Sequence, residues 1–377
     1  MDFEIYPFEK LNLLLEDIRA NEHYVPLSLT IGEPQFETPQ FILDALEKHA
    51  KLLNKYPKTS GEPVLREGIL SYLKNRFGLK LHNDQIIPTF GTRELLFNLP
   101  QFLLHDIDDP VMAFPNPFYQ IYEGAARASR AEIIHLDLDE EKSFRPMIDE
   151  EALKRCDLVI LNSPNNPTAS VMGVEEMKEW VELALKHDFI LLNDECYSDL
   201  YLNEPTPSLL DASIEAGNPG FKNILAINSI SKRSSAPGLR SGFIAGDREI
   251  LRRYMTYRTY VGCASPLPLQ YAAAAAWRDQ GHVETFRLKY RRNFELAREI
   301  LGVEAPEATF YIWLRVEDEI DFTVQLYREY NLKVLPGSFL GREGQGIGYV
   351  RLALVYEEEL TREALERIAL LQEKLAS

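Results

Sequence analysis

Between residues 85 and 246 the chain alternates short apolar runs with segments of helical pattern. Helical pattern separates several of the runs, as residues 173–187 do. This alternation is typical of units in which parallel strands are covered by helices. We expect strands at residues 85–88, 111–114, 132–136, 158–162, 189–193, 224–228 and 242–245. The sequence therefore predicts an α/β fold with a large, mostly parallel sheet.

The pattern changes after Gly246, where long amphipathic stretches replace the alternation. We expect helices at residues 249–260, 267–280, 283–301, 321–330 and 361–375, and strands at 309–316, 332–335 and 349–355. This mixture predicts a smaller α+β domain. We place the large domain at residues 39–265 and build the small domain from residues 1–38 and 266–377.

The composition argues against several classes of partner. The formal net charge of −17 disfavours binding to nucleic acid or to an anionic membrane. Cys156, Cys196 and Cys263 lie far apart, and neither they nor the histidines show a metal-ligand spacing, so no metal site is expected. The N-terminal residues have no signal-type apolar core, and the run 272–276 is too short to span a bilayer. We expect a cytoplasmic protein that acts on small molecules.

The segment 229–242, Ser-Ile-Ser-Lys-Arg-Ser-Ser-Ala-Pro-Gly-Leu-Arg-Ser-Gly, follows an expected strand. Ligands of open α/β sheets bind where strands end. The hydroxyls of Ser229 and Ser231 and the fork of Arg240 suit a phosphate. Lys232, desolvated beside other cations, would have the lowered pKa that imine formation with an aldehyde requires. A solvated basic turn explains any one of these residues, but the combination favours a binding site.

In these residues, and in further blocks along essentially the whole chain, the sequence resembles class I and II aminotransferases of the type I pyridoxal-phosphate fold. The resemblance implies pyridoxal 5′-phosphate as cofactor. It makes Lys232 the amine that forms the imine with the cofactor aldehyde, and it assigns the phosphate to Arg240, Ser229 and Ser231. One departure is Ser241, where the family usually has an apolar residue.

Two blocks that follow expected strands match the family's residues around the pyridine ring. The resemblance implies that Asp194 pairs with the pyridinium nitrogen and that Tyr197 and Asn166 bind the phenolic oxygen, with Asn166 also near the substrate. Read alone, Asp194 suits a helix cap and residues 165–168 suit an ordinary turn. Ala169 stands where the family usually has glycine.

Two further blocks match the family's phosphate and ring contacts. Gly91, Thr92 and Arg93 precede the helical pattern 95–104, and a helix start offers backbone N–H groups to an anion. The resemblance places the phosphate there, although a helix cap at Thr92 would look the same. It also makes Tyr119 the aromatic residue stacked on the pyridine ring, where ordinary packing is the alternative.

Three residues match positions that concern the substrate and the assembly. Arg351 lies in the expected strand 349–355, where an unpaired guanidinium is costly to bury. The resemblance implies that it binds the substrate α-carboxylate, while an internal Asp or Glu is the alternative partner. Gly32 matches the substrate-gating segment. Tyr56 matches a tyrosine that reaches the phosphate of a neighbouring subunit, which implies a homodimer.

Three segments, at residues 116–125, 231–242 together with 245–247, and 258–263, are most similar to N-succinyldiaminopimelate aminotransferases of lysine biosynthesis. The implied reaction exchanges an amino group between N-succinyl-LL-2,6-diaminopimelate and 2-oxoglutarate. Arg258 and Arg19 are our candidates for the distal carboxylates. Alternatives are an aspartate- or aromatic-type aminotransferase, a pyridoxal-phosphate lyase of the same fold, and a binding module of aminotransferase shape. For that module the expected DNA-binding element is not apparent before residue 30.

Overall fold

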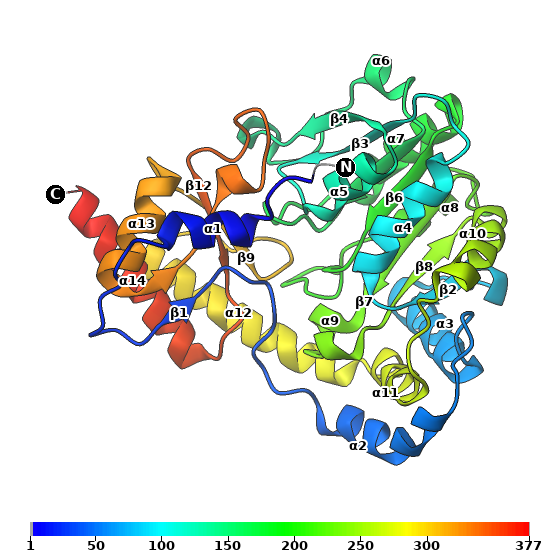
Figure 1. Cartoon of the computed structure of the whole chain (residues 1–377), viewed down its shortest axis with the longest axis horizontal. Coiled ribbons are helices and arrows are strands. Elements are labelled where there is room, and N and C mark those ends of the chain that lie inside the picture. The colour runs from blue at the N-terminus through cyan, green and yellow to red at the C-terminus, as the bar shows by residue number, and fades with distance from the viewer. Residues whose placement is uncertain (1–2, 377) are drawn as a thin grey trace.

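The computed structural model describes residues 3–376 (Figure 1). Its large sheet has the strand order β2-β8-β7-β6-β5-β3-β4. These strands are β2 (Ile86–Thr89), β3 (Val111–Asn116), β4 (Glu132–Asp137), β5 (Leu158–Asn162), β6 (Ile190–Asp194), β7 (Ile224–Ser229) and β8 (Gly242–Gly246). Strand β8 runs antiparallel to both neighbours, and the other pairs are parallel. The expected α/β fold with a mostly parallel sheet is confirmed, and each of the strands expected between residues 85 and 246 has its counterpart in this sheet.

Both faces of the large sheet are buried under helices. Along β5, Leu158 and Ile160 face one apolar cluster, and Val159 and Leu161 face the other, as the two-residue period of a strand requires. One cluster includes residues of α4 (Thr92–Leu104), α5 (Ile121–Ala128) and α10 (Arg248–Val261). The other includes residues of α2 (Gln40–His49), α3 (Pro63–Phe77), α7 (Val174–His187), α8 (Leu209–Glu215) and α11 (Leu267–Arg278). Burial on both sides explains why these strands are continuous apolar runs.

A second group of elements lies to the left of the large sheet in Figure 1. Its strands β9 (Tyr311–Arg315), β11 (Leu335–Pro336) and β12 (Tyr349–Ala353) form an antiparallel sheet in the order β11-β12-β9. Strand β1 (Leu27–Ser28) pairs in parallel with β10 (Leu332–Lys333). The helices of this group are α1 (Pro7–Leu15), α12 (Gly281–Leu301), α13 (Glu319–Tyr330) and α14 (Glu358–Ala376). The N-terminal residues therefore pair with the C-terminal part of the chain.

The single strand expected at residues 332–335 is wrong. The chain divides there, because Lys333 pairs with Ser28 whereas Leu335 pairs with Arg351 in a different sheet. Each pairing partner is remote in sequence, so the local apolar pattern does not reveal the break. The domain limits at residues 39 and 265 stay a prediction, and α11, which lies beyond the second limit, packs against α2 and α3.

Short elements complete the fold. They are α6 (Glu150–Leu153), α9 (Ile230–Arg233) and the 3₁₀ helices Ala50–Asn54, Asn83–Gln85, Glu140–Lys142, Pro237–Leu239 and Gly337–Phe339. None of the helices within residues 3–376 combines the length and the apolar composition that crossing a bilayer requires.

A buried charge network anchors α9, the helix that carries Lys232. The Asp199 carboxylate accepts from Arg233 Nε at 2.5 Å and from Arg76 Nε at 3.0 Å. Arg233 also donates to the Ala276 carbonyl at 2.8 Å. Burial alone would raise the pKa of Asp199, but the two guanidiniums hold this pKa below its ordinary value. The position of Lys232 therefore depends on a paired, buried carboxylate.

We expect Asp199→Asn to lower the free energy of unfolding by about 3–5 kcal/mol, because it leaves two buried guanidiniums without a counter-ion. Urea denaturation followed by circular dichroism measures this. Asp84→Asn is the matched control, since the Asp84–Arg248 pair is about half exposed on both sides and its loss should cost less than about 1 kcal/mol. Equal losses for the two variants would contradict the assigned role of Asp199.

Candidate active site

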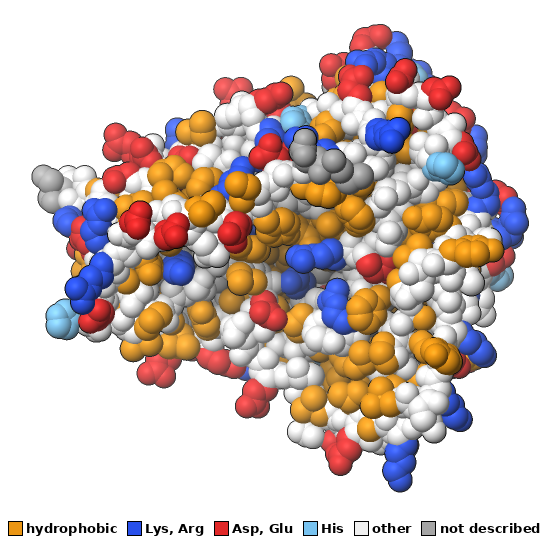
Figure 2. Space-filling view, in the orientation of Figure 1, with side chains coloured by type: hydrophobic (Ala, Val, Ile, Leu, Met, Phe, Trp, Pro, Cys, Tyr) orange, Lys and Arg blue, Asp and Glu red, His pale blue; other side chains and the backbone are white. Residues whose placement is uncertain are grey.

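The parallel register brings the ends of three strands together. Asn162 at the end of β5 is aligned with Asp194 at the end of β6, and Asp194 is aligned with Ile227 near the end of β7. A cavity of about 600 Å³ lies at this edge, and Figure 2 shows a hollow there with basic side chains inside it. Residues of the small sheet, such as Tyr311 of β9 and Arg351 of β12, line the opposite side of the cavity. The cavity therefore lies between the large sheet and the smaller group of elements.

Most of the site residues expected from sequence line this cavity. They are Gly32, Thr92, Arg93, Tyr119, Asn166, Asp194, Tyr197, Ser229, Ser231, Lys232, Arg240 and Arg351. Gly91 lies directly behind the wall, since a Cβ on it would be 2.2 Å from Arg240 Nη2. Tyr56 is 99% exposed and does not line the cavity, so its role toward a neighbouring subunit stays a prediction.

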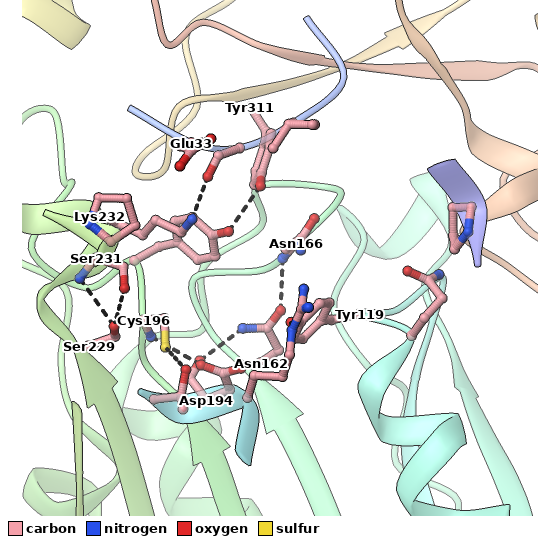
Figure 3. Close-up of a pocket in the computed structure, with 18 of the residues that line it drawn as sticks. Glu33, Tyr119, Asn162, Asn166, Asp194, Cys196, Ser229, Ser231, Lys232 and Tyr311 are labelled. Atoms are coloured by element: carbon pink, nitrogen blue, oxygen red, sulfur yellow. Dashed lines mark hydrogen bonds between the residues drawn. The ribbon is translucent and has the colours of Figure 1, made fainter. Parts of the chain in front are cut away.

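Lys232 extends into the cavity from α9 (Figure 3). Ser229 caps this helix by accepting from the Ser231 backbone N–H at 3.1 Å. Lys232 Nζ donates to the Gly32 carbonyl. Burial, helped by the charges of Arg351 and Arg240, lowers the pKa of Lys232 from 10.5 to about 8. Near neutral pH a larger fraction of this amine is therefore neutral and nucleophilic than in an ordinary lysine, although the protonated form still predominates at pH 7.

Asp194 presents a buried carboxylate to the cavity. Its Oδ2 accepts from the Tyr122 hydroxyl at 2.9 Å, and its Oδ1 accepts from the Cys196 backbone N–H at 3.2 Å. Burial raises the pKa of Asp194, while these hydrogen bonds and the charge of Lys232 act in the opposite direction. Among residues 3–376 no cation lies within 4.0 Å of it in an ion pair. The carboxylate is thus held ready for a cationic group of a ligand.

Arg351 is buried without an acidic partner. Its Nη1 donates to Asn166 Oδ1 at 2.6 Å and its Nη2 to the Thr30 carbonyl at 2.5 Å. The guanidinium lies 4.4 Å from the centre of the Tyr311 ring, and its Nε has no hydrogen-bond partner among residues 3–376. No ion pair with Asp or Glu occurs within the described part of the chain, so the alternative of an internal carboxylate is wrong. Unpaired donors here suit a carboxylate from outside.

The start of α4 forms a cradle for an anion. Gly91 precedes the helix with a φ of 73°, and no side chain caps the helix. Thr92 is the first helical residue rather than the cap. Across the cavity, the Ser229 hydroxyl donates to that of Ser231 at 2.9 Å, and Arg240 approaches Gly91. Free N–H groups, hydroxyls and a guanidinium are the donors that bind a phosphate.

The two sequence departures have local explanations. Ala169 has a φ of 63°, so it adopts the left-handed conformation that glycine favours. Ser241 is buried, and its hydroxyl accepts from Trp277 Nε1 at 3.3 Å. Neither residue disturbs the cavity wall.

Several residues that the sequence analysis did not name as site residues also line the cavity, and Tyr122, Tyr311 and Asn162 are three of those that bond to expected site residues. Tyr122 donates to Asp194, and the hydroxyls of Tyr311 and Tyr197 lie 3.0 Å apart. Asn162 donates to the Asp194 carbonyl at 2.8 Å. The position of Asn162 at the end of an expected strand was a usable signal. The two tyrosines gave no such signal, because their partners are distant in sequence.

The expected candidates for a distal carboxylate do not reach the cavity. Arg258 is buried and pairs with Glu94 at 2.8 Å, while Arg19 pairs with Glu22 on the exposed surface. Neither residue lines the cavity. Arg93 does, and its Nε donates to the Tyr119 hydroxyl at 2.8 Å. It makes no ion pair with a carboxylate among the residues that the structure describes.

Comparison with known proteins gives a consistent result. Residues 25–368 match the sequence profile of aminotransferase class I and II. The fold is similar to aminotransferase AspB of Helicobacter pylori, with a TM-score of 0.96, 50% identity and coverage of 99% of this chain and all of the other. The sequence is 33% identical to 4-dedimethylamino-4-oxo-anhydrotetracycline transaminase OxyQ of Streptomyces rimosus, over 91% of this chain and 92% of that protein. It is 29% identical to the LL-diaminopimelate aminotransferase of Dehalococcoides mccartyi, over 97% and 95%.

The lowered pKa of Lys232 predicts that its amine reacts at a lower pH than the amine of an ordinary lysine. In competitive acetylation of the cofactor-free protein, labelling of Lys232 should rise with pH and reach half its maximum at about pH 8. The reason is that only the neutral amine reacts. Lys154, whose pKa the hydrogen bond to Glu151 raises, is the internal control and should react at higher pH. Mass spectrometry of the peptides measures both, and a shared midpoint would contradict the lowered pKa.

Proposed function

Because the chain belongs to the class I and II aminotransferases, we propose that its amino donor is N-succinyl-LL-2,6-diaminopimelate and its acceptor 2-oxoglutarate. The family uses pyridoxal 5′-phosphate, so the enzyme is a pyridoxal-phosphate transaminase. The observation that carries the choice of substrate is a guanidinium beyond those of Arg351 and Arg240, that of Arg93, which lines the same cavity and makes no ion pair with a carboxylate of residues 3–376. Donor and acceptor both bear a distal carboxylate besides the α-carboxylate.

The residues of the cavity fit this cofactor. Asp194 is a buried carboxylate without a cation, which suits a pyridinium nitrogen. The cradle formed by the start of α4, Ser229, Ser231 and Arg240 suits the phosphate. Lys232 offers the amine for the aldehyde. When bound, pyridoxal phosphate supplies that aldehyde and a ring that takes up the electrons released at the substrate Cα.

The chain's own groups then have distinct roles. Arg351 binds the α-carboxylate with its planar fork, and Asn166, already bonded to it, keeps the fork oriented. Lys232, as a neutral amine, would take the proton from the substrate Cα. Asp194 holds the proton on the ring nitrogen. Tyr197, buried beside Tyr311, binds the phenolic oxygen.

The backbone of Arg93 belongs to the phosphate cradle at the start of α4, as expected from the resemblance, and its side chain is our candidate for the distal carboxylate, in place of Arg258 and Arg19. It lines the cavity beside the aromatic rings of Tyr119 and Tyr6, each 5.9 Å from its guanidinium carbon. Such a wall accepts the methylene chain of a long dicarboxylate and binds its charged end. The LL-diaminopimelate aminotransferase among the relatives and the three similar segments support this substrate class. We further propose a homodimer in which Tyr56 reaches the neighbouring phosphate, with the protein working in the cytoplasm.

A screen of amino donors with 2-oxoglutarate tests the substrate. We expect the highest kcat/KM for N-succinyl-LL-2,6-diaminopimelate and lower values for aspartate and phenylalanine. Keto-acid release is measured for each donor. Good turnover of another donor without turnover of the succinylated compound would overturn the choice of substrate. Turnover of a single amino acid without any keto acid would instead indicate a lyase.

Within the same screen, Arg93→Gln should lower kcat/KM for donors with a distal carboxylate on the order of 10- to 100-fold, because a charged hydrogen bond is lost. The value for phenylalanine should change little. Arg19→Gln is the matched control, since Arg19 is exposed and outside the cavity. An equal loss for every donor would assign Arg93 to the cofactor rather than to the substrate.

Asp194→Ala should reduce the rate by several orders of magnitude, because the ring nitrogen loses the carboxylate that keeps it protonated. Single-turnover measurement with saturating donor isolates this step, and circular dichroism checks that the fold is intact. A near-normal rate would show that a different carboxylate serves the ring.

A further inference from the structure

A loop locked by glycines leads into the strand that carries Arg351. The loop spans residues 337–348, between β11 and β12. A Cβ on Gly337 would lie 2.2 Å from the Gly346 carbonyl oxygen, and a Cβ on Gly341 would lie 2.1 Å from that of Gln345. The two sides of the loop are thus in backbone contact, where a side chain has no room. The loop is therefore closely packed on itself directly before β12.

This loop is docked by its backbone on the segment 116–123. Asn116, which is fully buried, accepts from the Arg342 N–H at 2.9 Å and donates to the Arg342 carbonyl at 3.1 Å. The Phe118 N–H donates to the Leu340 carbonyl at 3.0 Å, and Gln120 Nε2 donates to the same carbonyl at 3.3 Å. The bonds on both sides of Tyr119 therefore fix its backbone to the loop.

A buried ion pair completes the docking. Arg342 Nε and Nη2 donate to the two oxygens of Glu123 at 3.1 and 2.5 Å. Glu123 is 4% exposed. Burial would raise the pKa of Glu123, but Arg342, with Arg127 on the other side, holds it below its ordinary value. A bidentate pair of this kind fixes direction as well as distance.

The segment 116–123 carries two tyrosines whose side chains lie at the cavity. Tyr119 and Tyr122 both line the cavity, with their rings 5.8 Å apart and nearly perpendicular. Tyr122 precedes Glu123 directly and donates to Asp194. Burial raises the pKa of Tyr122 well above its ordinary value, so its hydroxyl stays protonated and remains a donor.

We propose that Arg342 is a positioning residue for the reaction, acting through Glu123 on Tyr119 and on the Tyr122–Asp194 bond. The inference rests on the proposed roles of Tyr119, Asp194 and Arg351. The loop 337–348 then connects β12, which carries Arg351, to the segment that carries Tyr119 and Tyr122. The ion pair sets the position of the ring contacts relative to Arg351.

The test uses the holoenzyme and Arg342→Gln. We expect the Kd for pyridoxal phosphate to rise on the order of 10-fold, and the pH at which the bound cofactor's absorption changes to shift, because Asp194 is held less firmly. We also expect kcat to fall more than KM rises. Arg315→Gln is the matched control, since the exposed Arg315–Glu140 pair joins β9 of the small sheet to the 3₁₀ helix that follows β4 and touches neither tyrosine. This control should leave all three quantities unchanged.

A double-mutant cycle with Glu123→Gln tests the pathway. If Arg342 acts through Glu123, the double variant should behave like either single variant. Arg342→Lys keeps the charge but loses the fork, so it should show a smaller loss of cofactor affinity and of kcat than Arg342→Gln. It replaces Arg342→Gln in the test if that variant does not fold. A lower melting temperature with unchanged Kd, absorption and kcat would overturn the proposal. Cofactor affinity and absorption do not depend on the donor, so a wrong choice of substrate would leave this test intact.

Discussion

The site depends on buried charges that have no counter-ion within the described part of the chain. The buried Asp194 lacks a cation, the buried Arg351 lacks a carboxylate, and the half-buried Arg240 beside them also lacks one. Burying such groups unpaired is costly, so the surrounding structure has to keep them apart and leave space for a ligand to join them. Other parts of the fold offset this cost in folding free energy. They are the two apolar clusters on the faces of the large sheet and paired charges such as those around Asp199. The ligand that completes the site carries charges of both signs.

The site is assembled from parts of the chain that are distant in sequence. Gly32 approaches Lys232 from the N-terminal segment, and a Cβ on Gly32 would lie 1.9 Å from the Tyr311 hydroxyl. Thr30 and Asn166 both bind Arg351. The pairing of β1 with β10 brings the N-terminal segment into reach of these residues. The surroundings of Arg351 and Lys232 therefore depend on how the smaller group of elements sits against the large sheet.

The sequence predicted what is local and missed what depends on distant contacts. Strand β5 was predicted to the residue, because a buried parallel strand is a continuous apolar run. Helix α3 was missed, although Pro63 begins it and Gly78 ends it in the left-handed conformation. The motif around Lys232 identified a cavity residue, whereas Arg258 was misassigned because its partner Glu94 is 164 residues away. The docking of Arg342 on Glu123 was equally invisible, since 219 residues separate them.

The reversed direction of β8 has a consequence for the spacing of Lys232 and Arg240. Because β7 and β8 are antiparallel, Ser229 is aligned with Gly242, and the connection between the two strands begins and ends at the same edge of the sheet. A parallel β8 would require a crossover that starts at this edge and ends at the other one, and Arg240 would then enter from the far side. The amine and the guanidinium thus belong to one compact hairpin-like insert. The short spacing of Lys232 and Arg240 along the chain is therefore a direct consequence of the antiparallel pairing of β7 with β8.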